Sequence, residues 1–198
     1  MPSRTPRQPA AESGPDRADI DAGLSDELAA VVSGARRRAL RDGDRQIDTA
    51  HLLHSLLESD PEVRAAFDSD PQVARLLGYL VQRSIGYGLR WQGTVEDSRA
   101  VPRVAEEGWS PAAADAMEEA GERAVLRGDA RARGADLLAA VVADPRSRAV
   151  EVLGRAGVDA GALLVRIENG VETAAEARAE IGVDVGVEDY VSGGGPGD

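Results

Sequence analysis

The chain carries an internal repeat, and this feature constrains its fold more than any other. When the sequence is shifted by 85 residues, residues 24–58 align with residues 109–143 without a gap, and ten positions are identical. The identical pairs are Ser25/Ser110, Ala29/Ala114, Ala35/Ala120, Arg38/Arg123, Ala39/Ala124, Gly43/Gly128, Asp44/Asp129, Ala50/Ala135, Leu52/Leu137 and Leu53/Leu138. A duplicated unit of this length predicts two similar folding units packed against each other.

The first half of each copy has the signals of a helix with a defined start and end. Ser25 and Ser110 are good N-cap residues, Pro111 suits the first turn, and Gly43 and Gly128 are typical helix stops. Apolar residues at helical spacing follow each cap: Leu28, Val31, Val32, Ala35, Ala39 and Leu40 in copy one, and Ala113, Ala116, Met117, Ala120, Ala124 and Val125 in copy two. We therefore predict an amphipathic helix at the start of each copy.

Three further helices follow in each copy. The second helix of copy one is capped by Asp48 or Thr49. The third helices open at Asp60-Pro61 and Asp144-Pro145, and the fourth at Asp70-Pro71 and Asp159. The predicted fold class is all-α, with repeat one at 24–84, a loop at 85–108 without periodicity, and repeat two at 109–169. Trp91 in that loop either packs on the bundle as a lid or is an exposed anchor.

The two ends of the chain differ from this body, which spans residues 24–170. Residues 1–23 are rich in Pro, Arg, Ser and Asp and are predicted to be a disordered arm. Residues 171–198 are strongly acidic and end in SGGGPGD, so we also expect them to be disordered. The acidic segment is either a solubilising tail or a peptide that docks on a basic partner.

Composition excludes several functional classes. The net charge of −12 disfavours nucleic acid as a partner, and no apolar run is long enough to span a membrane. The chain contains no cysteine and no lysine, which excludes thiolate zinc sites, Schiff-base chemistry and the lysine of a P-loop. No catalytic motif stands out, so we expect a cytoplasmic protein that is not an enzyme and needs no cofactor.

The only two histidines lie on one predicted helix. His51, His54 and Glu58 have the spacing of one helix face and could together hold a metal ion. The second copy has Asp136 and Ala139 in place of the histidines. We therefore expect His51 to be packed, His54 to be an exposed neighbour, and no metal to be bound.

The repeat resembles that of the N-terminal domain of Clp chaperones, the ATP-driven unfoldases that feed the Clp peptidase. Trp109-Ser110-Pro111 resembles the family's Phe-Thr-Pro, and the run from Asp48 to Leu53 (DTAHLL) resembles Gly-Thr-Glu-His-Leu-Leu. The run 149–159 (AVEVLGRAGVD) is similar to the repeat's closing motif. The resemblance covers residues 24–169 and neither end.

The resemblance implies a bundle of two four-helix repeats related by pseudo-twofold symmetry, without the ATPase modules. It implies a non-catalytic module that binds peptides or proteins and modulates Clp-dependent proteolysis as an adaptor or a decoy. Its partners would be Clp protease components, substrates or adaptors. The alternative is sequestration of cyclic-peptide antibiotics that target Clp, with an enzyme of unknown type as a remote third possibility. The oligomeric state is left open.

The resemblance also suggests which residues contact the ligand. The family's apolar contact patch corresponds to Leu24, Val32, Trp109 and Met117. Trp109 could anchor a peptide, or it could simply staple the start of its own helix. The glutamates with which some family members bind phosphorylated arginine are replaced by Ala50 and Ala135, so we expect that recognition to be weak or lost.

Overall fold

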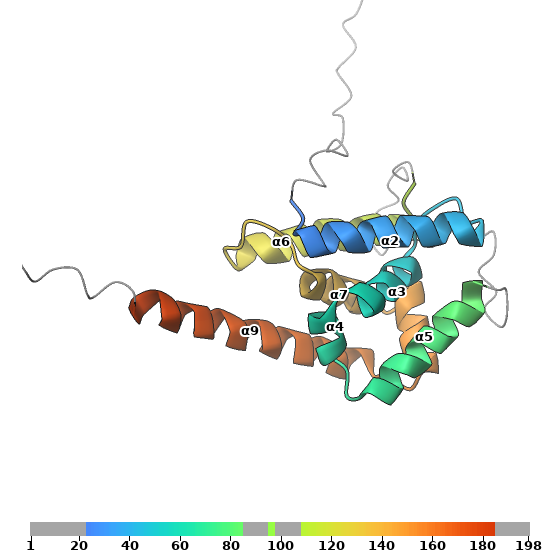
Figure 1. The fold of residues 1–198 in the computed structure, drawn as a ribbon. Helices are drawn as coiled ribbons and strands as arrows, with labels where there is room; N and C mark the ends of the chain where they lie inside the picture. Colours follow the sequence, from blue (N-terminus) through green and yellow to red (C-terminus); the bar gives the residue numbers. More distant parts are fainter. Residues whose placement is uncertain (1–22, 85–94, 98–107, 185–198) are drawn as a thin grey trace, which may run out of the picture.

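The computed structural model describes residues 23–84, 95–97 and 108–184, and these form two sets of four helices (Figure 1). The first set is α2 (Asp26–Asp42), α3 (Thr49–Ser59), α4 (Pro61–Ala65) and α5 (Asp70–Ser84). The second is α6 (Pro111–Leu126), α7 (Gly134–Ala143), α8 (Arg148–Arg155) and α9 (Ala160–Asp184). The described residues contain no strand beyond two isolated bridges, which confirms the all-α prediction. Among them, no helix is long and apolar enough to cross a membrane.

The starts of the helices follow the duplication. Helices α2 and α6 start 85 residues apart, and so do α3 and α7. Ser25 and Ser110 cap the first helices by accepting hydrogen bonds from the backbone N–H groups of Leu28 and Ala113. Gly43 and Gly128 follow those helices with φ of 75° and 80°, a left-handed conformation that glycine adopts without steric cost. The local signals in the sequence therefore set the boundaries of the first helix of each copy.

The copies diverge at their third helices, and here one prediction was wrong. Helix α8 begins at Arg148, not at Asp144-Pro145, because Ser147 provides the cap. The Ser147 hydroxyl accepts from the backbone N–H of Val150 and donates to the carbonyl of Val141, so it joins α8 to the end of α7. Helix α8 has eight residues, whereas its counterpart α4 has five.

Helices α3 and α7 form the centre of the core. In Figure 1 they lie beneath a layer made by α2 and α6, with α4, α5, α8 and α9 on their other sides. Almost every side chain from residue 49 to 57 and from 134 to 142 is buried. The helical spacing of apolar residues also placed Leu40 of α2 and Val125 of α6 on the packed face, but each is 74% exposed. Each directly follows a buried alanine, about 100° around the helix from the face that packs.

The two copies pair through reciprocal backbone contacts. Leu24 forms a bridge with Ala132, and Trp109 forms the equivalent bridge with Ile47. The nitrogen of Ser25 donates to the carbonyl of Ala132 at 3.0 Å, and the nitrogen of Ser110 donates to the carbonyl of Ile47 at 2.8 Å. A shift of 85 residues converts each contact into the other, which is the arrangement expected of two copies related by a pseudo-twofold axis.

Helix α9 differs from the prediction for the acidic end. The sequence predicted disorder from residue 171, but α9 continues to Asp184. The segment from 172 to 180 (ETAAEARAE) consists mainly of Ala, Glu and Arg, whose high helix propensity favours continuation of the helix. Residues 185–198, residues 1–22 and the loop tryptophan Trp91 lie outside the described residues.

Candidate functional site

The four residues predicted to contact a ligand are all buried. Leu24, Val32, Trp109 and Met117 have exposed fractions of 6, 5, 8 and 7%. Leu24 and Trp109 belong to the two reciprocal bridges. The Trp109 carbonyl also accepts a hydrogen bond from Gln46 Nε2 at 2.8 Å. Leu24 and Trp109 therefore join the two copies, Val32 and Met117 belong to the core, and a contact with a ligand stays a prediction.

A groove with a volume of about 420 Å³ lies between α4, α7 and α9. Its walls are mostly apolar, and the residues that line them include Val63, Phe67, Leu138, Ile167 and Val171. The polar side chains at its edge are those of Glu62, Arg166 and Asn169. The exposed Ala65 of α4 also lines it.

The groove reflects the difference between the two copies. Helix α8 packs against α3, α5, α7 and α9, whereas the main contacts of the shorter α4 are with α3 and α7. The turn after α4 reaches α9 through Arg166, which donates to the Ala66 carbonyl at 3.0 Å and pairs with Asp68 at 2.9 Å. Beside α4, Val171 of α9 is half-buried, whereas Leu138 of α7 and Ile167 of α9 form the buried floor of the groove.

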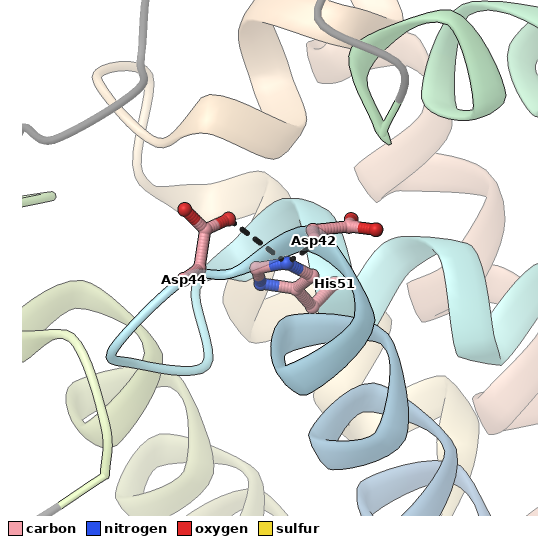
Figure 2. Close-up of side chains that lie close together, drawn as sticks. All are labelled: Asp42, Asp44 and His51. Atoms are coloured by element: carbon pink, nitrogen blue, oxygen red, sulfur yellow. Dashed lines mark ion pairs between the residues drawn. The ribbon is translucent and has the colours of Figure 1, made fainter.

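A second cluster lies where α2 turns into α3 (Figure 2). Figure 2 shows the carboxylates of Asp42 and Asp44 beside the same nitrogen of the His51 ring. Nε2 of His51 lies 3.3 Å from Asp44 Oδ2 and 3.7 Å from Asp42 Oδ2. His51 is 1% exposed, and its Nε2 has no hydrogen-bond partner among the described residues.

The other ring nitrogen of His51 faces Asp48, the N-cap residue of α3. Nδ1 lies 2.8 Å from Asp48 Oδ1, and it accepts a hydrogen bond from the backbone N–H of Asp48 at 3.1 Å. Asp48 also pairs with Arg83 and, at 2.6 Å, with Arg148. Burial alone would raise the pKa of the Asp48 carboxyl, but the hydrogen bond from His51 and the two guanidinium groups outweigh it. The pKa of Asp48 therefore lies well below its usual range, and the carboxylate is ionised.

The same location in copy two has the opposite arrangement of charge. Arg127, which aligns with Asp42, donates to Asp136 and to Asp129. Asp136 aligns with His51, and its carboxylate also accepts from the backbone nitrogen of Arg133 at 2.8 Å. The hydrogen bonds from Arg127 to Asp136 hold the pKa of the guanidinium above its usual range although burial lowers it. A cation therefore lies between positions 129 and 136 in copy two.

His54 belongs to a separate environment. It is 5% exposed rather than exposed as predicted, and its Nε2 lies 3.2 Å from Glu58. Burial, with the nearby guanidinium of Arg38, lowers the pKa of His54 to about 4, against the opposing effect of Glu58. In the described part of the chain, the ligand atoms of His51, His54 and Glu58 do not form one metal-binding group, whereas those of Asp42, Asp44 and His51 lie within 4.8 Å of one another.

Sequence reasoning missed a buried carboxylate in the segment between the copies. Glu96 is 5% exposed and accepts from the backbone nitrogens of Thr49 at 2.9 Å and Arg148 at 2.7 Å. The hydroxyls of Ser110, at 3.0 Å, and Thr49 also donate to it. Glu96 thus caps α3 and α8, one helix from each copy. A lone glutamate in a stretch without periodicity carries no signal that could have identified it.

The comparisons with known proteins found matches to the fold of this chain but none to its sequence. No family model and no curated protein sequence matches it. The N-terminal domain of the caseinolytic protease-associated chaperone ClpD from Arabidopsis thaliana superposes with a TM-score of 0.51 and 14% identity, over 76% of this chain and 95% of that domain. A chain from preliminary structural investigations of a malarial protein secretion system gives 0.54 and 13%, with the same coverage. The chain therefore shares the fold of a Clp N-terminal domain.

Proposed function

We propose that this protein is a non-catalytic module that binds peptides or proteins and modulates Clp-dependent proteolysis, as an adaptor or a decoy. The observation that carries the proposal is the fold, which matches the ClpD N-terminal domain over 95% of that domain. The short motifs around Trp109 and Asp48 agree with it. An adaptor would deliver substrates to an unfoldase, whereas a decoy would occupy ligands intended for it.

The groove beside α4 supports a binding role more directly than the residues first predicted. Leu24, Val32, Trp109 and Met117 offer little surface to a partner, because each is more than nine-tenths buried. Of the apolar residues that line the groove, Ala65 is exposed and Ala66 and Val171 are half-buried, so these three offer apolar surface beside the polar groups at the edge. Burying such surface under the apolar side chains of a peptide stabilises a complex by roughly 25 cal/mol per Å² of apolar area.

A reconstituted degradation assay tests the function. A Clp unfoldase and peptidase degrade a fluorescent model substrate with and without a molar excess of this protein. An adaptor raises the degradation rate, and a decoy lowers it in a saturable, concentration-dependent way. An unchanged rate for substrates of several classes would refute the proposal.

Two matched variants test the surface. Ala65→Asp places a charge in the groove at an exposed helix position, and Ala162→Asp makes the same change on α9 outside it. We expect Ala65→Asp to abolish the effect on degradation and Ala162→Asp to retain it. If both variants behave like the original protein, the groove is not the binding surface and another face must be sought.

A further inference from the structure

We propose that Asp42, Asp44 and His51 bind a zinc ion where α2 turns into α3 (Figure 2). This site is independent of the proposed function. It departs from the expectation that His51 is only a packed histidine, because the two ring nitrogens have very different surroundings. The argument rests on the distances around Nε2, on the partner of Nδ1 and on the equivalent position in copy two.

The distances around Nε2 are too long for hydrogen bonds and suit a shared ion. A hydrogen bond between a ring nitrogen and a carboxylate has a length of about 2.9 Å. Nε2 lies instead 3.3 Å from Asp44 and 3.7 Å from Asp42. Tetrahedral zinc with bonds of about 2.0–2.1 Å separates neighbouring ligand atoms by about 3.4 Å. Both distances from Nε2 therefore suit ligands of one zinc ion, and the ligand atoms of all three side chains lie within 4.8 Å of one another.

The contact on the far side of the ring leaves Nε2 ready to bind a metal. A zinc-bound His51 carries its proton on Nδ1, where Asp48 Oδ1 at 2.8 Å can accept it in place of the hydrogen bond that Nδ1 accepts from the Asp48 backbone N–H. In the neutral ring that proton on Nδ1 leaves the lone pair on Nε2, which points at Asp42 and Asp44. A carboxylate that orients the histidine in this way is the usual outer partner of a zinc-bound imidazole.

Copy two shows that this location takes a cation. The guanidinium of Arg127 lies between Asp129 and Asp136, the counterparts of Asp44 and His51. In copy one the residue aligned with Arg127 is Asp42, so the side chain that would supply the positive charge is an acid. A zinc ion bound by Asp42, Asp44 and His51 restores a cation at the equivalent place.

The neighbouring charges are compatible with a divalent ion. Arg83 lies 3.2 Å from Asp44 Oδ2, but it also pairs with Asp48, which has Arg148 as a second partner. A carboxylate has about four lone-pair sites, so Asp44 can accept from Arg83 and still bind a metal. Zinc neutralises the remaining charges of Asp42 and Asp44. The side chain of Asp44 is 26% exposed, which gives the ion a path from solvent and leaves room for a water ligand.

Zinc titration of the full chain tests the site. The protein is dialysed against a chelator, then against buffer, and Zn²⁺ is added in a calorimeter at neutral pH. We expect one saturable site per chain. His51→Gln and Asp44→Asn should each weaken it at least tenfold. His54→Gln removes the other buried histidine and Asp26→Asn removes a fully exposed carboxylate, so both should retain the affinity.

Nitrogen NMR of the histidine rings gives a second readout that needs no variant. The chain has only two histidines, so two sets of ring signals are expected. Zinc should shift Nε2 of one ring and leave its Nδ1 protonated, and should leave the second ring unchanged. Three results would overturn the proposal: no saturable site, a site that survives in Asp44→Asn, or a His51 ring that stays doubly protonated in excess zinc, which would show that a proton alone supplies the charge.

Discussion

Replacing Glu96 with glutamine should destabilise the fold sharply, although Glu96 is a single residue in the segment between the copies. Its two carboxylate oxygens accept from four donors: the nitrogen and hydroxyl of Thr49, the hydroxyl of Ser110 and the nitrogen of Arg148. The Thr49 hydroxyl accepts in turn from the nitrogen of Ala149, so the network joins the starts of α3, α6 and α8. Glutamine keeps the shape of the side chain but removes the charge and one of the two acceptor oxygens.

The expected magnitude follows from the donors that lose their partner. A glutamine oxygen accepts two of the four hydrogen bonds, and the amide NH₂ then faces the remaining donors. The hydroxyls can rotate to accept from that NH₂, but a buried backbone N–H cannot. Hydrogen bonds to a charged group contribute roughly 1.5–3 kcal/mol each, so we expect a loss of about 3 kcal/mol for Glu96→Gln and about 5 kcal/mol for Glu96→Ala.

Urea unfolding followed by circular dichroism measures this loss. With an m value of about 2 kcal/mol per molar urea, 3 kcal/mol moves the midpoint down by about 1.5 M. Asp97→Asn is the matched control, because Asp97 is the exposed neighbour and should change stability by less than about 0.5 kcal/mol. A midpoint for Glu96→Gln that equals that of Asp97→Asn would refute the view that Glu96 holds the two copies together.

Three further predictions concern the remaining features of the bundle. Gly43→Ala and Gly128→Ala should each lower the free energy of unfolding by about 1 kcal/mol, because both residues have positive φ. Nothing lies within 4 Å of the added methyl group, so the loss comes from the backbone conformation and not from a clash. Equal losses in thermal unfolding would fit the duplication, and no loss at either site would contradict the role of the left-handed turn. The free energy of unfolding should fall by up to about 3 kcal/mol as the pH drops from 6.5 to about 4, because His54 stays neutral in the folded state while the unfolded chain binds the proton. His54→Gln should remove that part of the pH profile of stability. An unchanged profile in the variant would show that His54 does not cause the fall. Asp136→Asn should cost about 3 kcal/mol by leaving the Arg127 guanidinium short of a charged partner, and a loss below 1 kcal/mol by urea titration would show that Asp129 suffices.

Local signals in the sequence predicted the elements whose boundaries depend on local contacts. Ser25, Ser110 and Gly43 cap or end their helices through hydrogen bonds to residues within one turn. The start of α8 was missed because Ser147 competes with Asp144-Pro145, and Ser147 prevails through an additional hydrogen bond to α7. A signal of that kind depends on a neighbouring helix and cannot be read from spacing.

The candidate site was harder to predict than the fold. The large apolar ring of Trp109 is typical of a residue that anchors a peptide, but the bridge to Ile47 places Trp109 in the core. The acidic turn and His51 were visible in the run from 42 to 51 (DGDRQIDTAH), and the spacing of acids around a histidine that starts a helix could have indicated the cluster. The opposite charge pattern in copy two becomes meaningful only when the helices are superposed in space.

The reciprocal bridges have a consequence for how the chain acquires its shape during synthesis. Residues 23–25 hydrogen-bond to Ala132, which the ribosome adds more than one hundred residues later. Ile47 likewise hydrogen-bonds to residues 108 and 110, which are synthesised after it. The nascent first half therefore emerges with an unpaired edge that only the second half can complete. We expect a chain with one copy alone to dimerise, so the duplication converts an intermolecular contact into an intramolecular one.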